Sequence, residues 1–142
     1  MAEPPAPSPA GYSGTPLARK LGIKAASRLL LIDAPPGFAA LLRPLPEGVT
    51  FMDQAGPQVD IAHVFVMHEQ SLAAQLGALR ASLRPNAILW ISWPKKAARL
   101  PTTVTEDRIR ALALPLGWVD VKVCAIDAVW SGLLLVVRKA LR

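Results

Sequence analysis

Hydrophobic residues fall in short continuous runs that Pro, Gly and polar clusters separate. The segment Arg28–Asp33 is apolar at four successive positions and is followed by Ala-Pro-Pro-Gly, a pattern typical of a strand buried on both faces of a parallel sheet. Comparable runs at Val49–Met52, Asp60–Met67 and Asn86–Trp93 predict three further strands. The pattern therefore indicates a buried and mostly parallel sheet.

In the segments between these runs, apolar residues recur at the three- or four-residue spacing of a helix. Glu69–Arg84 carries leucines three or four residues apart and is closed by Pro85, which predicts an amphipathic helix. Thr103–Glu106 has the form of a capping box and predicts the start of a helix that Gly117 ends. Two shorter helices are predicted over Thr15–Gly22 and Phe38–Arg43.

The end of the chain predicts an antiparallel hairpin. Trp118–Asp127 and Trp130–Lys139 are of strand length, and the two residues between them are too few for a crossover. The full order of elements predicts an α/β fold, an open three-layer Rossmann-like sheet with helices on both faces. We expect one domain over residues 14–142, after a Pro/Ala-rich tail over residues 1–13 that lacks regular structure.

Composition narrows the class of protein. Of 142 residues, 52% are hydrophobic and 18% charged, which excludes a disordered chain. The apolar runs are too short to span a membrane, and one cysteine with two histidines can form neither an internal disulfide nor a closed zinc site of the usual kind. With no signal-like start, we expect a cytoplasmic protein that has no membrane partner.

Two segments carry a resemblance to a known fold. The passage Leu79–Trp90, with its basic residue and proline between helix and strand, resembles class I methyltransferases, and so does the helix, strand and antiparallel strand at the end. Gly11–Leu17, Trp90–Lys96 and Val119–Asp127 resemble a small bacterial family classed as a domain of unknown function, the one numbered 3052. The first resemblance implies S-adenosylmethionine as cofactor, and the second implies no activity.

Ligands of such sheets bind beyond the carboxyl ends of the strands. Because the first residue of the last strand returns to the same edge, the hairpin contributes to that edge as well. The sequence therefore predicts a ligand-binding rim made of Asp33, Gly37, Asp53, His68, Trp93, Lys95, Lys96, Asp127 and Trp130.

The loop after the first strand argues against the implied cofactor. It reads Asp-Ala-Pro-Pro-Gly-Phe, and two prolines remove two of the backbone donors that such loops offer to a ligand. Asp53 favours the cofactor, because an acid at the end of the second strand of this fold commonly accepts hydrogen bonds from a ribose diol. Asp53 also fits an ordinary turn aspartate. No cofactor is predicted from these residues.

Trp93–Lys96 is the most chemically distinctive segment. Two lysines on a loop at this edge suit a phosphate or carboxylate, and an indole can stack on a ring or a cation. The alternative is a solvated basic loop with Trp90 and Trp93 as core residues, which point to opposite faces because they lie three apart.

Other chemical interpretations are weaker. His68–Leu72 begins like a zinc-protease helix but has leucine where the second histidine is required. His63, within an apolar strand, is interpreted as a buried and hydrogen-bonded histidine, and Cys124 as a core residue. No catalytic or metal-binding residue is predicted.

The net charge of +6, from 16 basic and 10 acidic residues, leaves three hypotheses open. The leading one is a non-catalytic module that binds a small anionic or nucleotide-like ligand or a partner, with a degenerate cofactor loop. The second is an atypical S-adenosylmethionine-dependent methyltransferase. The third is a nucleic-acid-associated protein, although no nucleic-acid-binding module is recognisable.

Overall fold

One mixed sheet organises residues 15–142, the part of the chain that the structure, a computed structural model, describes. Its strands are β1 (Arg28–Ile32), β2 (Thr50–Met52), β3 (Ile61–Phe65), β4 (Ile88–Pro94), β5 (Trp118–Ala125) and β6 (Trp130–Val137). They lie side by side in the order β2-β1-β3-β4-β6-β5. The tail predicted over residues 1–13 lies outside the described residues.

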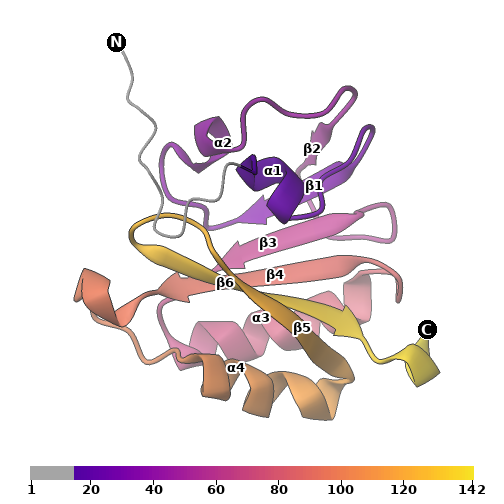
Figure 1. Cartoon of the computed structure of the whole chain (residues 1–142). Coiled ribbons are helices and arrows are strands. Elements are labelled where there is room, and N and C mark those ends of the chain that lie inside the picture. The colour runs from indigo at the N-terminus through magenta and orange to yellow at the C-terminus, as the bar shows by residue number, and fades with distance from the viewer. Residues whose placement is uncertain (1–14) are drawn as a thin grey trace.

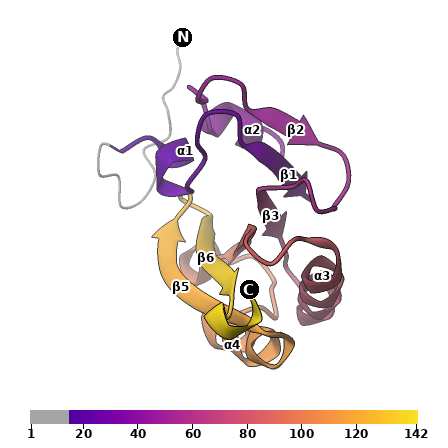
Figure 2. The same cartoon turned by 90° about the vertical axis from the view of Figure 1, so that its right-hand side faces the viewer.

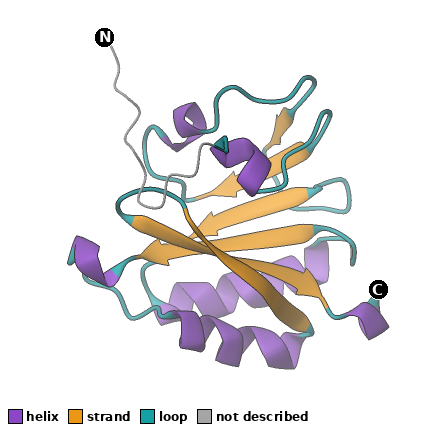
Figure 3. Cartoon of the chain, in the orientation of Figure 1, coloured by secondary structure: helices purple, strands orange, loops and turns teal. Residues whose placement is uncertain are grey.

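The sheet is parallel from β2 to β4 and antiparallel beyond. β1 pairs in parallel with both β2 and β3, and β3 pairs in parallel with β4. β6 runs antiparallel to β4 and to β5, so the predicted hairpin is present, with a bulge between Asp120 and Lys122. In Figure 3 the arrowheads of β1, β3 and β4 point to one side and that of β6 to the other.

Helices cover both faces of the sheet, as predicted (Figures 1 and 2). One face carries α1 (Leu17–Lys20) and α2 (Phe38–Leu41), and the other carries α3 (Glu69–Ser82) and α4 (Glu106–Ala113). Three short 3-10 turns complete the described elements, η1 (Lys96–Ala98), η2 (Leu114–Leu116) and η3 (Lys139–Leu141).

Alternation along the central strands builds a separate core on each face. Ala62, Val64 and Leu89 point to the α3/α4 side, where they pack with the leucines of α3. Ile61 and Phe65 point to the α1/α2 side and pack with Phe38 and Trp90. The predicted separation of Trp90 and Trp93 onto opposite faces is confirmed, since Trp93 belongs to the α3/α4 core.

The sequence signals for helix ends are partly confirmed. Gly22 follows α1 with a φ of 82°, and the N–H of Ile23 returns to the carbonyl of Ala18, a Schellman closure. The predicted capping box is wrong by two residues: Thr105 caps α4 by accepting the N–H of Arg108. Thr103 instead accepts the N–H of Glu69 at 2.7 Å, so it caps α3 across the fold.

Trp90 fixes α1 to the middle of the sheet. Its indole is fully buried, and Nε1 donates a 2.9 Å hydrogen bond to the carbonyl of Leu21, at the end of α1. Gly132 on the neighbouring strand leaves room for the ring, because a Cβ there would lie 3.2 Å from Trp90 and 3.0 Å from Ile126. The sheet thus holds the segment that follows α1 through one side chain.

Replacing Trp90 by Phe is expected to lower the free energy of unfolding by about 1–3 kcal/mol, because the Leu21 carbonyl loses its buried donor. Urea unfolding measures the loss, and amide hydrogen exchange at Gly22 and Ile23 should accelerate. Trp118→Phe is the control, since its longer 3.3 Å bond goes to Leu76 in α3. Unchanged exchange at Gly22 and Ile23 in Trp90→Phe would contradict this role.

Candidate functional site

The order of the strands defines where a ligand site would lie. The chain passes from β1 outward to β2 and then returns to the other side of β1 as β3. In open α/β sheets, ligands bind at such a reversal, beyond the carboxyl ends of the strands. The reversal here lies between β1 and β3.

The predicted residues lie at that carboxyl edge. Asp33, Asp53 and His68 follow β1, β2 and β3, and Lys95 follows β4. The hairpin turn is at the same edge, because Trp130 pairs with Pro94 at the end of β4. The topology thus gathers the predicted positions at one edge. Their side chains differ in burial and in the hydrogen bonds that they make.

A tight turn closes the loop after β1. The N–H of Phe38 donates to the carbonyl of Pro35 at 3.1 Å, and Gly37 has a φ of 85° and a ψ of −6°, the geometry of a type II turn with Pro36 and Gly37 at its centre. Gly37 serves this backbone conformation rather than a close approach, since a Cβ there would have nothing within 4 Å.

The two aspartates beside this loop are exposed carboxylates. Asp33 adopts a left-handed φ of 57° directly after β1, and Asp53 follows β2. Neither carboxylate has a hydrogen bond or an ion pair within residues 15–142. Both remain available to accept hydrogen bonds from a ligand.

His68 occupies the N-cap position of α3 but makes no side-chain cap. Its neighbour Glu69 is held by Arg108 through two contacts, of 2.5 and 3.1 Å. That hydrogen-bonded pair lowers the pKa of Glu69 and connects α3 to α4. The exposed imidazole of His68 therefore lies beside a structural contact.

Trp93 and Lys96 border a hollow next to α4. The hollow has a volume of about 540 Å³, and its wall also includes Thr102, Val104 and Asp107. Trp93 is 8% exposed, so most of its indole is core, while Lys96 is exposed. Both interpretations of this segment thus apply in part: the tryptophan packs in the core, Lys95 is half-buried and Lys96 is exposed to solvent.

Asp127 and Trp130 hold the hairpin turn. Oδ1 of Asp127 accepts the N–H groups of Val129 and Trp130, each at 2.8 Å. The Trp130 ring meets Phe65 edge-on, with 5.1 Å between centroids. The carbonyl of Val129 also accepts the N–H of Lys95, so this turn positions the basic loop.

His63 is buried and hydrogen-bonded, as predicted. Its Nε2 lies 2.6 Å from Oγ of Ser92, and its ring stacks on Phe65 with 4.6 Å between centroids. Burial lowers the pKa of His63 to about 3. The sequence did not point to Ser92 as the partner, because Ser92 lies diagonally across the register, where Trp90 pairs with His63.

Two other charged clusters stabilise the fold. Arg84 donates to Asp60 at 2.5 Å and to the carbonyls of Pro57 and Val59. Burial would raise the pKa of Asp60, but the N–H of Arg28 and the guanidinium of Arg84 outweigh it, so the pKa is lowered. The second cluster joins Arg110 to Glu106, Asp107 and Asp120.

Within the described residues, no three His, Cys, Asp or Glu side chains gather closely enough to hold a metal ion. In residues 15–142, no helix has the length and apolar character needed to cross a membrane.

Comparison with known proteins supports the fold. No family model and no curated protein matches the sequence. The resemblance to the family numbered 3052 therefore stays a prediction. Among solved structures, the chain is similar to DhpI in complex with S-adenosylhomocysteine, with 12% identity and a TM-score of 0.59 over 87% of this chain and 83% of that one.

TrmN from Thermus thermophilus is similar at 14% identity and a TM-score of 0.52, over 85% of this chain. LepI, in complex with S-adenosylmethionine, is similar at 14% identity and 0.52 over 86%. This chain spans 47% of TrmN and 39% of LepI. These likenesses show that the chain shares the Rossmann-like α/β fold of these proteins.

The stability that neutral His63 gives is fully present above the pKa of about 6.5 that it has when exposed, and it is lost as pH falls toward 3. Between pH 7 and pH 4 this should remove about 3 kcal/mol from the free energy of unfolding. Urea unfolding at both pH values measures it.

The double variant His63→Phe with Ser92→Ala is the control, since it replaces both partners by apolar groups. Carboxylates titrate alike in both proteins, so the difference between them isolates His63. An equal pH dependence in the variant would rule out this assignment.

Proposed function

We propose that the chain is a non-catalytic module that binds a small anionic or nucleotide-like ligand at the carboxyl edge of its sheet. The observation that carries the proposal is the loop after β1, which keeps the place of a cofactor loop but has lost two backbone donors to prolines and a third to its own turn.

The loop fits S-adenosylmethionine poorly. Such a loop works by presenting backbone N–H groups at a helix N-terminus. Here Pro35 and Pro36 have no N–H, and that of Phe38 is used within the turn. The helix that follows, α2, has four residues, too few for a strong N-terminal dipole. No methyl-transfer step is derived from these residues.

The rest of the edge suits a nucleotide-like ligand. Asp53 offers a free carboxylate to a ribose diol, and Lys95 and Lys96 offer charge to a phosphate. β2 and β4 are three sheet positions apart, about 14 Å at the usual strand spacing. A ligand with hydroxyls at one end and an anion at the other matches this separation of opposite charges.

An atypical S-adenosylmethionine-dependent methyltransferase is the second candidate. Similar solved structures hold S-adenosylmethionine or S-adenosylhomocysteine, and the free carboxylate of Asp53 supports it as well. This candidate requires S-adenosylmethionine to bind with fewer backbone N–H donors after β1 than such loops usually offer.

Calorimetry separates the two candidates. We expect neither S-adenosylmethionine nor S-adenosylhomocysteine to release measurable heat at about 1 mM, the upper end of typical substrate concentrations. The reason is that Pro35 and Pro36 remove two backbone N–H donors from the loop. Micromolar binding that Asp53→Ala abolishes, and that Glu47→Ala leaves unchanged, would establish the methyltransferase alternative. Glu47 is a matched control because it is an exposed acid outside the carboxyl edge.

Adenosine monophosphate is expected to bind, and Lys95→Gln with Lys96→Gln should weaken it about tenfold, as expected when two charges near a phosphate are lost. The double variant Arg138→Gln with Lys139→Gln makes the same change in net charge at exposed positions beyond β6. Equal affinities of the two variants would mean that the basic loop holds no phosphate.

A further inference from the structure

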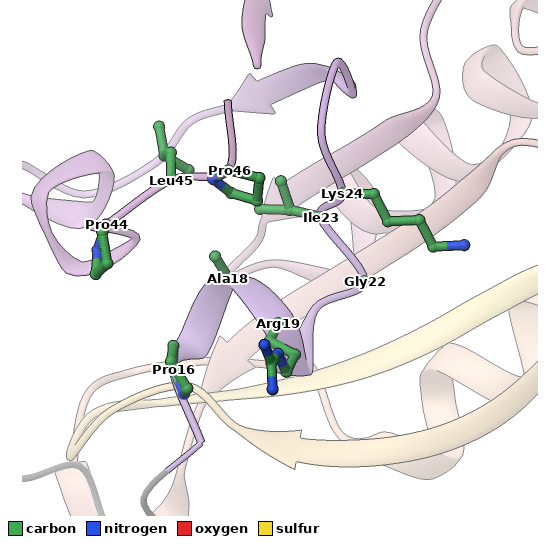
Figure 4. Close-up of a pocket in the computed structure, with 9 residues that line it drawn as sticks. All are labelled: Pro16, Ala18, Arg19, Gly22, Ile23, Lys24, Pro44, Leu45 and Pro46. Carbon is green, nitrogen blue, oxygen red and sulfur yellow. The ribbon is translucent and has the colours of Figure 1, made fainter. Parts of the chain in front are cut away.

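A second hollow lies on the α1/α2 face, away from the residues predicted from the sequence. It has a volume of about 530 Å³, within the range of small-molecule pockets. One wall is α1 with the residues that follow it, and the other is the segment between α2 and β2 (Figure 4). Its apolar residues are Pro16, Ala18, Ile23, Pro44, Leu45 and Pro46.

Two cations stand at the rim of this hollow. Arg19 and Lys24 complete the lining together with Gly22, and no acidic residue of the described part of the chain belongs to it. In Figure 4 Arg19 lies beside Ala18, whereas the Lys24 side chain extends away from the other lining residues, on the side opposite Pro44. Within residues 15–142 neither the guanidinium of Arg19 nor the ammonium of Lys24 has a hydrogen bond or an ion pair. The hollow therefore combines an aliphatic wall with two unpaired positive charges.

The chemistry of the lining limits the ligand. Among residues 15–142, the lining contains no aromatic ring on which a base could stack, and no carboxylate, amide or hydroxyl side chain that could hydrogen-bond a base or a sugar. A purely inorganic anion would leave the aliphatic wall without a partner. An aliphatic body with one anionic group satisfies both parts of the lining.

The walls are held before any ligand arrives. Trp90 fixes the end of α1 through the carbonyl of Leu21, and the Schellman closure at Gly22 directs Ile23 inward, where it is 4% exposed. The N–H of Ala26 donates to the carbonyl of Glu47 at 2.8 Å, which joins the segments that follow the two walls in the chain. A preformed hollow reduces the entropic cost of binding.

We propose that this hollow binds a small amphipathic anion, an aliphatic carboxylate or phosphate, with its chain against Leu45 and the prolines and its charge at Arg19 and Lys24. This is a binding site beyond the function proposed for the carboxyl edge, and it stands or falls independently of that function.

Octanoate is the probe, and two-dimensional NMR of the uniformly 15N-labelled full chain is the measurement. Saturable shifts are expected at amides of α1, Gly22–Lys24 and the residues around Leu45. Octanol, which has the same chain without the charge, should bind at least about fivefold more weakly, as expected when a charge-assisted contact is lost. Equal binding of octanol, or shifts centred on Lys95–Arg99, would overturn the proposal.

Arg19→Gln with Lys24→Gln should weaken octanoate about tenfold, whereas Arg138→Gln with Lys139→Gln, with the same change in net charge, should leave it within about twofold. Leu45→Asp should abolish binding by placing a like charge in the wall. Dispersed amide spectra verify that each variant is folded. Octanoate affinity unaffected by Arg19→Gln with Lys24→Gln would reject the site.

Two further arms test other sources of negative charge. Phosphatidylglycerol vesicles that bind the chain while octanoate does not would assign Arg19 and Lys24 to a membrane surface, and would overturn the proposal. A single-stranded oligonucleotide retained through the same two residues, again without octanoate binding, would assign them to nucleic acid with the same consequence.

Discussion

The hydrogen bond from the Trp90 indole to the carbonyl of Leu21 is the contact on which the α1/α2 face depends. α1 has only four residues, too few to be stable alone, so its position comes from this bond and from the burial of Ala18 and Leu21. Gly132 favours this position of the ring, because a Cβ there would lie only 3.2 Å from Trp90. Strand β6 is thereby linked, through Trp90, to a helix more than a hundred residues earlier in the chain.

The two faces of the sheet differ in how completely helices cover them. The α3/α4 face is covered by two helices whose buried side chains are aliphatic, and the Glu69–Arg108 pair ties these helices together. The α1/α2 face is covered by two single-turn helices and contains the polar pair of His63 and Ser92. Short helices leave gaps between segments, which is why the hollow at Ile23 and Leu45 lies on this face.

Elements with strong local signals could be predicted from the sequence. The hairpin, the helix of leucines over α3 and the glycine after α1 all depend on spacing or on backbone conformation, which a short segment determines. The capping-box spacing from Thr103 to Glu106 predicts Thr103 as the cap of α4, but the approach of α3 makes Thr103 the partner of Glu69 and leaves Thr105 to cap α4.

Contacts between distant segments could not be predicted. Ser92 becomes the partner of His63 through a diagonal register that sequence alone does not fix, and the hollow at Arg19 needs two segments about twenty residues apart. For Asp127, sequence placed the residue at the correct edge but could not show that its carboxylate is already engaged by two backbone N–H groups.

The pairing of charges within the fold decides where the excess positive charge is left free. Most acidic side chains of residues 15–142 are engaged, by Arg84, Arg108 and Arg110 or by the hairpin turn. The carboxylates of Asp33 and Asp53 are free and follow neighbouring strands, whereas free cations border both hollows, Lys96 at one and Arg19 with Lys24 at the other. Among the described residues, the hollow beside α1 is lined by cations without acids, whereas the hollow at Lys96 also carries Glu106 and Asp107. At the β1–β2 end the two free carboxylates disfavour an anion and suit a hydroxyl-rich or cationic group.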